Sequence, residues 1–189
     1  MAPRKTIPEL KHLDHVLVSE TAIKQRVKAL ADKISRTYRG QELTVIAIVN
    51  GALIFAADLL RQLRTPLRLD CLRAASYHSG TQAVNKPVIV DNLKLDITGR
   101  QVLLVDDILD TGNTLFAVRQ LLLAKGARQV RTCVLLDKKA RRSVPFEAEY
   151  VGFEIPDEFV VGYGLDFNER YRNLPCIGVL KPKYYAPKK

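Results

Sequence analysis

The sequence predicts an α/β fold in which a central, mostly parallel β-sheet is flanked by helices. Apolar runs of strand length occur at residues 44–49, 102–105 and 130–136. Continuous apolar runs are typical of parallel strands that are buried on both faces. Segments with helical periodicity alternate with these runs, which indicates βαβ units. Ligands of such sheets bind at the carboxyl ends of the strands, so the loops that follow these runs are the first place to look for a site.

The first predicted helix covers residues 20–37, with Ser19 as its N-cap. Its apolar side chains recur at helical spacing, at Ile23, Val27, Leu30 and Ile34. The β-branched run Thr44–Val49 is the next element, a buried strand. The turn Asn50-Gly51 then leads into a second helix over residues 52–63.

Pro66 ends this region, and residues 67–75 return as a strand. Residues 76–87 are polar and lack any periodicity, so we expect a mobile loop that is long enough to have a function. A short strand is predicted at 88–90. The strand at 102–105 is expected to end at the acids that follow it.

The third helix is predicted from about Leu115 to Lys125, with Gly126 as its C′ residue. The strand over residues 130–136 follows it. Another strand is expected at Phe159–Tyr163, with an acid at position 166 just beyond it.

Length and composition narrow the class of protein. With 189 residues and no repeat, the chain is expected to form a single domain over residues 1–189. Its core is expected at about residues 38–165, with a small hood formed by the N-terminal segment and residues 166–189. A net charge of +10 suits either nucleic acid or a small polyanion. The basic residues are scattered and no nucleic-acid motif accompanies them, which favours the small polyanion.

The location is expected to be the cytoplasm. The first residues have no apolar core for a signal peptide, and no apolar run approaches the length of a membrane span, so no membrane partner is expected. The three cysteines, Cys71, Cys133 and Cys176, are isolated among apolar neighbours. Buried free thiols in a reducing compartment explain them better than disulfides or a metal site.

Residues 102–114 are the most informative stretch. A buried strand runs into three carboxylates, Asp106, Asp107 and Asp110, and a Thr-Gly-Asn-Thr loop then opens a helix. Such a loop points backbone N–H groups and a helix N-terminus at one spot, which suits a phosphate monoester. The adjacent acids would repel that phosphate, but they can accept hydrogen bonds from a vicinal diol. The stretch therefore predicts a site for a phosphorylated ribose.

This stretch resembles the phosphoribosyl pyrophosphate (PRPP) motif of type I phosphoribosyltransferases. Asp110 before Thr111-Gly112 resembles the variant of the hypoxanthine-guanine phosphoribosyltransferases. The resemblance implies the type I phosphoribosyltransferase fold and a catalytic role for Asp110 at purine N7. It implies that the phosphate and ribose of PRPP are bound by Asp106, Asp107, Asp110, Thr111, Gly112, Asn113 and Thr114.

Residues 153–172 resemble the C-terminal signature of the same enzymes. The resemblance implies that Phe159 stacks on the purine and that the Val160 backbone reads its edge. Asp166 would lie at the purine site and hold Mg²⁺, with Asp106 and Asp107 as further metal ligands. Lys138, thirteen residues before Val151, matches the family's lysine that contacts the purine O6.

The resemblance also implies which residues bind the pyrophosphate. Its ligands would be Asn50 and Gly51 in the turn after the first strand, Arg172, and the Ser76-Tyr77 pair of the lid loop. Two residues depart from the family pattern. Asn50 stands where a lysine is frequent, and Asp106 stands where a glutamate is common. The backbone donors of the turn survive the first change, and the shorter acid can reach the ribose through water.

The implied activity is purine salvage, in which a 5-phosphoribosyl group passes from PRPP to hypoxanthine or guanine and gives IMP or GMP and pyrophosphate. The implied cofactor is Mg²⁺, and the implied assembly is a homodimer or homotetramer. Three alternatives remain: an RNA regulator of the same fold that binds PRPP, a phosphoribosyltransferase for adenine or xanthine, and a paralogue that binds nucleotide without turnover. The sequence does not decide between hypoxanthine and guanine as the preferred base.

Overall fold

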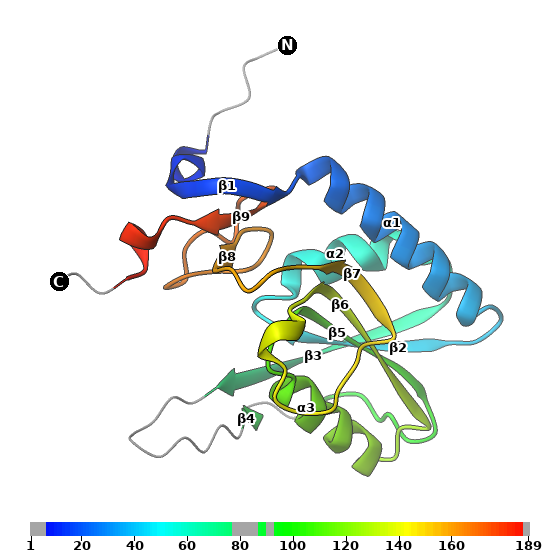
Figure 1. The fold of residues 1–189 in the computed structure, drawn as a ribbon. Coiled ribbons are helices and arrows are strands. Elements are labelled where there is room, and N and C mark those ends of the chain that lie inside the picture. Colours follow the sequence, from blue (N-terminus) through cyan, green and yellow to red (C-terminus); the bar gives the residue numbers. More distant parts are fainter. Residues whose placement is uncertain (1–6, 77–86, 90–92, 187–189) are drawn as a thin grey trace.

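The computed structural model describes residues 7–76, 87–89 and 93–186, and it contains a large and a small β-sheet (Figure 1). The strand order of the large sheet is β4-β3-β2-β5-β6-β7. Five of these strands are parallel, and β4 at the edge is antiparallel to β3. The strands are β2 (Leu43–Val49), β3 (Leu67–Ser76), β4 (Pro87–Ile89), β5 (Gln101–Leu109), β6 (Gln129–Asp137) and β7 (Tyr150–Glu154). The predicted fold class is confirmed.

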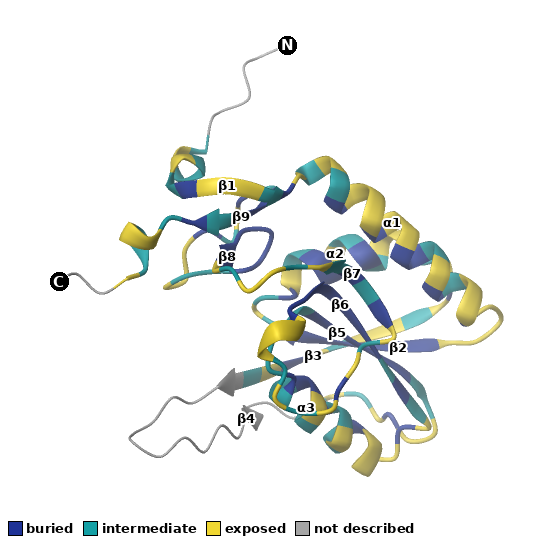
Figure 2. Ribbon diagram, in the orientation of Figure 1, coloured by how far each residue is buried: buried dark blue, intermediate teal, exposed yellow. Residues whose placement is uncertain are grey.

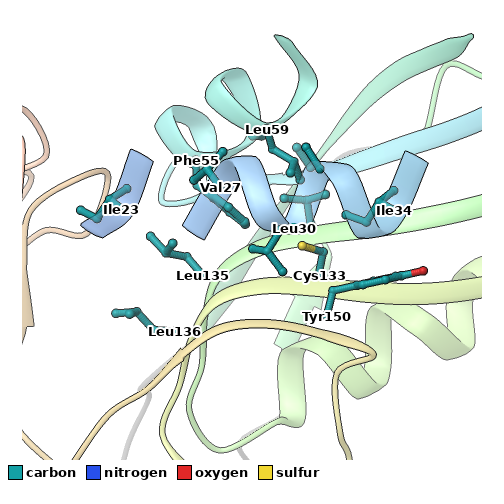
Figure 3. Close-up of a cluster of buried hydrophobic side chains, with 14 of the residues drawn as sticks. Ile23, Val27, Leu30, Ile34, Phe55, Leu59, Cys133, Leu135, Leu136 and Tyr150 are labelled. Atoms are coloured by element: carbon teal, nitrogen blue, oxygen red, sulfur yellow. The ribbon is translucent and has the colours of Figure 1, made fainter. Parts of the chain in front are cut away.

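Helices cover both faces of this sheet. One face packs against α1 (Glu20–Thr37) and α2 (Leu53–Gln62), and the other packs against α3 (Asn113–Ala124). Figure 2 shows the central strands β5 and β6 as almost continuously buried. Figure 3 shows the core on the first face, where side chains of α1 and α2 meet those of β6 and β7.

The predicted first helix is confirmed in detail. Ser19 is its N-cap, and the Ser19 Oγ accepts a hydrogen bond from the Ala22 N–H at 3.2 Å. The residues predicted to face the core are all buried, namely Ile23, Val27, Leu30 and Ile34. Gly126, predicted as the C′ residue of the third helix, has a φ of +87°, a conformation that favours glycine. None of the described helices is long and apolar enough to cross a membrane.

The small sheet joins the two ends of the described chain. Its order is β1-β9-β8, formed by β1 (Leu13–Val18), β8 (Val160–Val161) and β9 (Ile177–Leu180), all antiparallel. Figure 1 shows it beyond one end of the large sheet. Short 3-10 helices flank it at Pro8–His12 and Pro182–Tyr184, and a third lies at Lys139–Arg141. A separate apolar cluster stabilises it, with Leu13, Val161, Tyr171, Leu174, Cys176 and Leu180 buried.

Three predicted boundaries differ from the structure by two residues or more. Strand β5 does not end at the acids but continues to Leu109, because it pairs with β6 as far as Leu109 and Asp137. Helix α3 begins at Asn113, two residues earlier than predicted. The strand predicted at Phe159–Tyr163 is limited to Val160–Val161, because the backbone enters the left-handed region at Gly162 and Tyr163. At the end of β5, pairing with the central strand β6 outweighs the poor strand propensity of aspartate.

The prediction that all three cysteines are buried is wrong for Cys71, which is exposed, whereas Cys133 and Cys176 are buried. Alternate residues of a strand share a face. Leu69 lies on the same face of β3 as Cys71 and is 46% exposed. The apolar neighbours of Cys71 in the sequence thus lie partly on an uncovered part of the sheet.

Candidate functional site

The loop between β5 and α3 is the centre of the candidate site. Gly112 occupies the N-cap position of α3 with a φ of +87°. A Cβ at Gly112 would also lie 3.0 Å from side-chain atoms of Arg142 and Val144. Glycine is therefore required here both by the backbone conformation and by the packing. The loop brings Asp110, Thr111 and the first N–H groups of α3 to the carboxyl end of the sheet, as predicted.

The first two acids of the motif form a buried pair. Asp106 is 7% exposed, and its Oδ1 accepts a hydrogen bond from the Asp107 N–H at 3.0 Å. Burial, and then the neighbouring Asp107 charge, raise the pKa of Asp106 well above its ordinary value. Burial also raises the pKa of Asp107, which hydrogen bonds from Asp106 and Ile108 and the charge of Arg172 oppose. A cation or a diol at this pair would relieve an unfavourable concentration of negative charge.

The carboxylate of Asp110 is only partly satisfied. Its Oδ2 lies 3.3 Å from Nη1 of Arg141. Its Oδ1 is buried and has no hydrogen-bond partner in the described structure. Because a buried unsatisfied acceptor is costly, this oxygen is available to a ligand that donates a proton or a hydrogen bond.

The turn after β2 packs directly against the acid pair. The Val49–Asn50 peptide bond is cis. A Cβ at Gly51 would lie 2.1 Å from Oδ2 of Asp107, so no side chain fits there. A Cβ at Gly164 would lie 2.2 Å from the Gly51 carbonyl oxygen. The turn 49–51, the end of β5 and the segment after β8 therefore converge, as the predicted pyrophosphate site requires.

Asp166 and Arg172 form an ion pair beside this turn. Arg172 Nη1 lies 2.8 Å from Asp166 Oδ1 and also donates to the Gly164 carbonyl at 2.8 Å. Its Nη2 contacts Glu169 Oε2 at 2.8 Å. The Arg172 side chain is 25% exposed and that of Asp166 is 28% exposed. Because the Gly164 that Arg172 holds packs on Gly51, and Gly51 packs on Asp107, the ion pair lies next to the acid pair.

Lys138 and Phe159 also come together. Lys138 is only 5% exposed, and its Nζ donates to the Glu158 carbonyl at 2.9 Å. Nζ lies 3.8 Å from the Asp157 carboxylate. Phe159 is 38% exposed, whereas the next residue, Val160, is buried. A buried ammonium beside an exposed ring is an arrangement that suits a flat polar ligand.

Arg142 is a site residue that sequence reasoning missed. Its Nε donates to the Asp110 carbonyl at 3.1 Å, and its guanidinium also bonds the Phe146 carbonyl and the Asp137 carboxylate. The Ser143 N–H donates to the Thr111 carbonyl at 2.9 Å. The segment that carries Lys138 is thereby tied to the loop that carries Asp110. In the sequence, Arg142 is one charge in a basic run, and no local signal separates it from a solvated side chain.

Other predicted residues contribute less or cannot be assessed. Asn50 is exposed at the turn. The Thr111 Oγ1 accepts a 3.4 Å hydrogen bond from the Asn113 N–H, and the Asn113 Nδ2 contacts the Ser143 Oγ at 3.1 Å. Ser76 ends β3, while Tyr77 and most of the predicted lid loop lie outside the described residues. Within residues 7–76, 87–89 and 93–186, no three acidic, histidine or cysteine side chains form a preformed metal cluster.

Comparisons with known proteins agree with this geometry. Residues 17–168 match the model of the phosphoribosyl transferase domain family. The chain is 41% identical over 174 residues to the hypoxanthine-guanine phosphoribosyltransferase of Staphylococcus aureus strain Mu50, covering 92% of this chain and 97% of that protein.

Two further similarities extend this finding. The bifunctional protein TilS/HprT of Listeria innocua is also 41% identical over 174 residues, but the chain spans only 27% of its length. A crystal structure of a hypoxanthine phosphoribosyltransferase from Staphylococcus aureus superimposes with a TM-score of 0.92 at 39% identity. That match covers 97% of this chain and the whole of the other.

Proposed function

The chain belongs to the hypoxanthine-guanine phosphoribosyltransferases, and on this premise we propose that it transfers the 5-phosphoribosyl group of PRPP to N9 of hypoxanthine or guanine. The products are IMP or GMP and pyrophosphate, and the process is purine salvage in the cytoplasm. The observation that supports this best is the link between two loops. The loop of Asp106–Thr114 and the segment of Lys138 are joined through Arg142, so a phosphoribosyl site adjoins a purine site.

PRPP is proposed to bind the loop after β5. The 5′-phosphate accepts hydrogen bonds from the loop backbone and from the N-terminus of α3, over residues 110–114. The ribose hydroxyls donate to Asp106 and Asp107, the buried acid pair at the end of β5. The pyrophosphate lies against Asn50, Gly51 and Arg172, with Ser76 and Tyr77 of the lid loop as further ligands. The small sheet serves as the hood that covers the purine.

Mg²⁺ fits the donors at this site. Asp166, Asp106 and Asp107 offer the hard carboxylate oxygens that Mg²⁺ prefers, and a cation would offset the raised pKa of the buried pair. Mg²⁺ in phosphate-transfer sites is usually held by one or two carboxylates together with substrate phosphates, so it needs no preformed cluster. When bound, it neutralises the charge of the pyrophosphate leaving group.

The purine is proposed to stack on Phe159, with its edge read by the Val160 backbone and by the Asp166 segment. The Lys138 ammonium has three donors and no acceptor, so it suits the O6 carbonyl of hypoxanthine or guanine. The unsatisfied Oδ1 of Asp110 suits purine N7, where Asp110 acts as general base or as an electrostatic anchor. The lid loop excludes water, which would otherwise hydrolyse the reactive ribosyl centre.

The decisive assay measures pyrophosphate release from PRPP with hypoxanthine, guanine, xanthine and adenine in separate reactions. Turnover with the 6-oxopurines and little with adenine is the expected result. Turnover with adenine and not with the 6-oxopurines would instead favour a phosphoribosyltransferase for adenine. No turnover with any of the four bases would favour the RNA regulator or the paralogue that binds nucleotide without turnover.

Lys138→Gln tests the selectivity. It should raise the KM for hypoxanthine and narrow the gap to adenine, because the charged donor facing O6 is lost. A buried donor or acceptor that loses its hydrogen bond costs about 1–3 kcal/mol, which corresponds to a change of roughly 5- to 150-fold in the KM. Lys139→Gln is the matched control, since Lys139 is exposed and pairs with Glu154 at the surface. If both substitutions change the KM for hypoxanthine equally, Lys138 is not part of the purine site.

We also propose that the chain assembles as a homodimer or homotetramer. Leu53 and Leu69 are 57% and 46% exposed, and Cys71 shares the face of β3 with Leu69. Contiguous exposed apolar patches are frequent at interfaces between subunits, and these side chains are candidates for such a patch. Light scattering coupled to size exclusion measures the mass directly, and a monomer at micromolar concentration would contradict the proposal.

A further inference from the structure

The ring of Phe159 is stacked on a second aromatic ring from the C-terminal region. The centroids of Phe159 and Tyr185 lie 4.5 Å apart, with an angle of 19° between the planes. Phe167 meets the same Phe159 ring edge-on, at 5.6 Å and 85°. Both are favourable arrangements of aromatic pairs. The stacked Tyr185 ring therefore covers one face of Phe159, while 38% of Phe159 stays exposed.

The position of Tyr185 is set by the small sheet. Its N–H donates to the Pro182 carbonyl at 3.1 Å, and the Ala186 N–H donates to the same carbonyl at 2.8 Å. Tyr185 and Phe167 both pack against the apolar cluster of that sheet. The Leu180 N–H donates to the Phe159 carbonyl at 2.9 Å, so β9 holds the backbone of Phe159 as well. Tyr185 and Phe159 are thus both held by the small sheet.

We infer that Tyr185 is a positioning residue for the purine base, which it serves by covering one face of Phe159 and leaving the opposite face for the base to stack on. The inference rests on the proposed function, since it takes Phe159 as the stacking residue. Tyr185 does not touch the base. It restricts the Phe159 ring to one orientation, while Lys138, bonded to the Glu158 carbonyl, is held beside it. The ring and the ammonium that recognise the base then keep a constant relative position.

The test is a kinetic comparison of Tyr185→Ala, Tyr185→Phe and Tyr185→Leu with the parent enzyme. Tyr185→Ala should raise the KM for hypoxanthine by about 2- to 12-fold, which is the usual contribution of an aromatic pair expressed as a ratio. The KM for PRPP should stay unchanged, because Phe159, on which Tyr185 stacks, is not among the residues proposed to bind PRPP. Tyr185→Phe should behave as the parent, since the stacking ring and not the hydroxyl is required. Tyr185→Leu, which keeps the bulk and loses the ring, should fall between.

Tyr184→Ala is the matched control. Tyr184 is the last residue of the 3-10 helix and directly precedes Tyr185, but its ring stacks on His12 at 4.1 Å and not on Phe159. It should leave the KM for hypoxanthine within about twofold of the parent if the effect of Tyr185 is specific. An equal rise in Tyr184→Ala and Tyr185→Ala would overturn the inference, because general damage to the small sheet would explain both.

Two further outcomes are decisive. A fall in the KM for hypoxanthine in Tyr185→Ala would show that Tyr185 occupies the place of the base, which overturns the inference. An equal rise in the KM for hypoxanthine and the KM for PRPP in Tyr185→Ala would also overturn the inference. If Tyr185→Ala fails to fold, the contrast between Tyr185→Leu and Tyr185→Phe carries the same test. Failure of the proposed function is distinguishable, because the parent would then show no turnover with hypoxanthine at all.

Discussion

Removal of the Arg142 charge should destabilise this protein strongly. Its ion pair with Asp137 is largely buried, with the two side chains 16% and 7% exposed. Arg142→Met keeps the length of the side chain but leaves the Asp137 carboxylate buried without its partner. Loss of one member of a buried pair costs about 3–5 kcal/mol in the free energy of unfolding. For a chain of this size, that corresponds to a fall of roughly 6–20 °C in Tm.

Urea unfolding of the parent and of Arg142→Met measures this difference directly. Lys139→Met is the matched control, because Lys139 and its partner Glu154 are both 64% exposed. Removing an exposed pair should change the free energy of unfolding by about 0–1 kcal/mol. A loss below about 1 kcal/mol in Arg142→Met would refute the reasoning that the pair is buried and interdependent.

A second substitution separates stability from function. Asp137→Leu in the Arg142→Met background removes the unpaired charge and should restore much of the lost stability. Turnover should remain low, because Arg142 also holds the carbonyls of Asp110 and Phe146, and no apolar side chain replaces those hydrogen bonds. Full recovery of turnover would show that the link between the two loops is not needed for catalysis.

Three other predictions follow from the site. Asp110→Asn should keep the fold and PRPP binding but lower turnover by about 10²–10⁴-fold, and a change of only a few-fold would exclude Asp110 from acid–base chemistry. Activity should require Mg²⁺ or Mn²⁺, so full turnover in excess EDTA would contradict the metal assignment. Asp106→Asn should stabilise the protein in urea unfolding, and more at pH 8 than at pH 5. The raised pKa of Asp106 means that the folded state loses stability as pH rises and the group ionises, which a neutral amide avoids; an equal gain at both pH values would contradict this.

The parts of the fold that depend on local pattern were predictable from the sequence. The strands at Thr44–Val49 and 130–136 and the helix capped by Ser19 follow from apolar periodicity and capping, and the structure confirms them. The small sheet is different. Leu13 pairs with Leu180 across most of the chain, and no local pattern specifies a pairing between residues so far apart.

The same distinction applies to the candidate site. The acids were visible because three carboxylates after an apolar strand are unusual and have a chemical reason to occur together. The roles of Arg142 and Tyr185 could not be predicted from the sequence, because each acts through a partner that only the fold brings near. Arg142 reads as a solvated charge in a basic run, and Tyr185 reads as an aromatic near a chain end. Their roles depend on where residues 138–143 and the segment after β9 lie in space.

The ion pair of Arg172 with Asp166 leads to one more expectation about how ligands bind. Arg172 is proposed to bind pyrophosphate and Asp166 to hold Mg²⁺, yet the two are bonded to each other at 2.8 Å. Pyrophosphate alone must separate them and leave Asp166 without its cationic partner, and Mg²⁺ alone leaves Arg172 paired only with Glu169, whereas both ligands together satisfy both residues. Pyrophosphate and Mg²⁺ should therefore each bind more tightly in the presence of the other, and linkage requires the same factor from either side. Because Mg²⁺ also binds pyrophosphate in solution, calorimetric titrations corrected for that complex should compare the parent with Asp166→Ala. The factor by which each ligand tightens the binding of the other, typically 5- to 150-fold for coupled sites, should be smaller in Asp166→Ala. An unchanged factor would show that the exchange of partners between Asp166 and Arg172 does not carry the coupling.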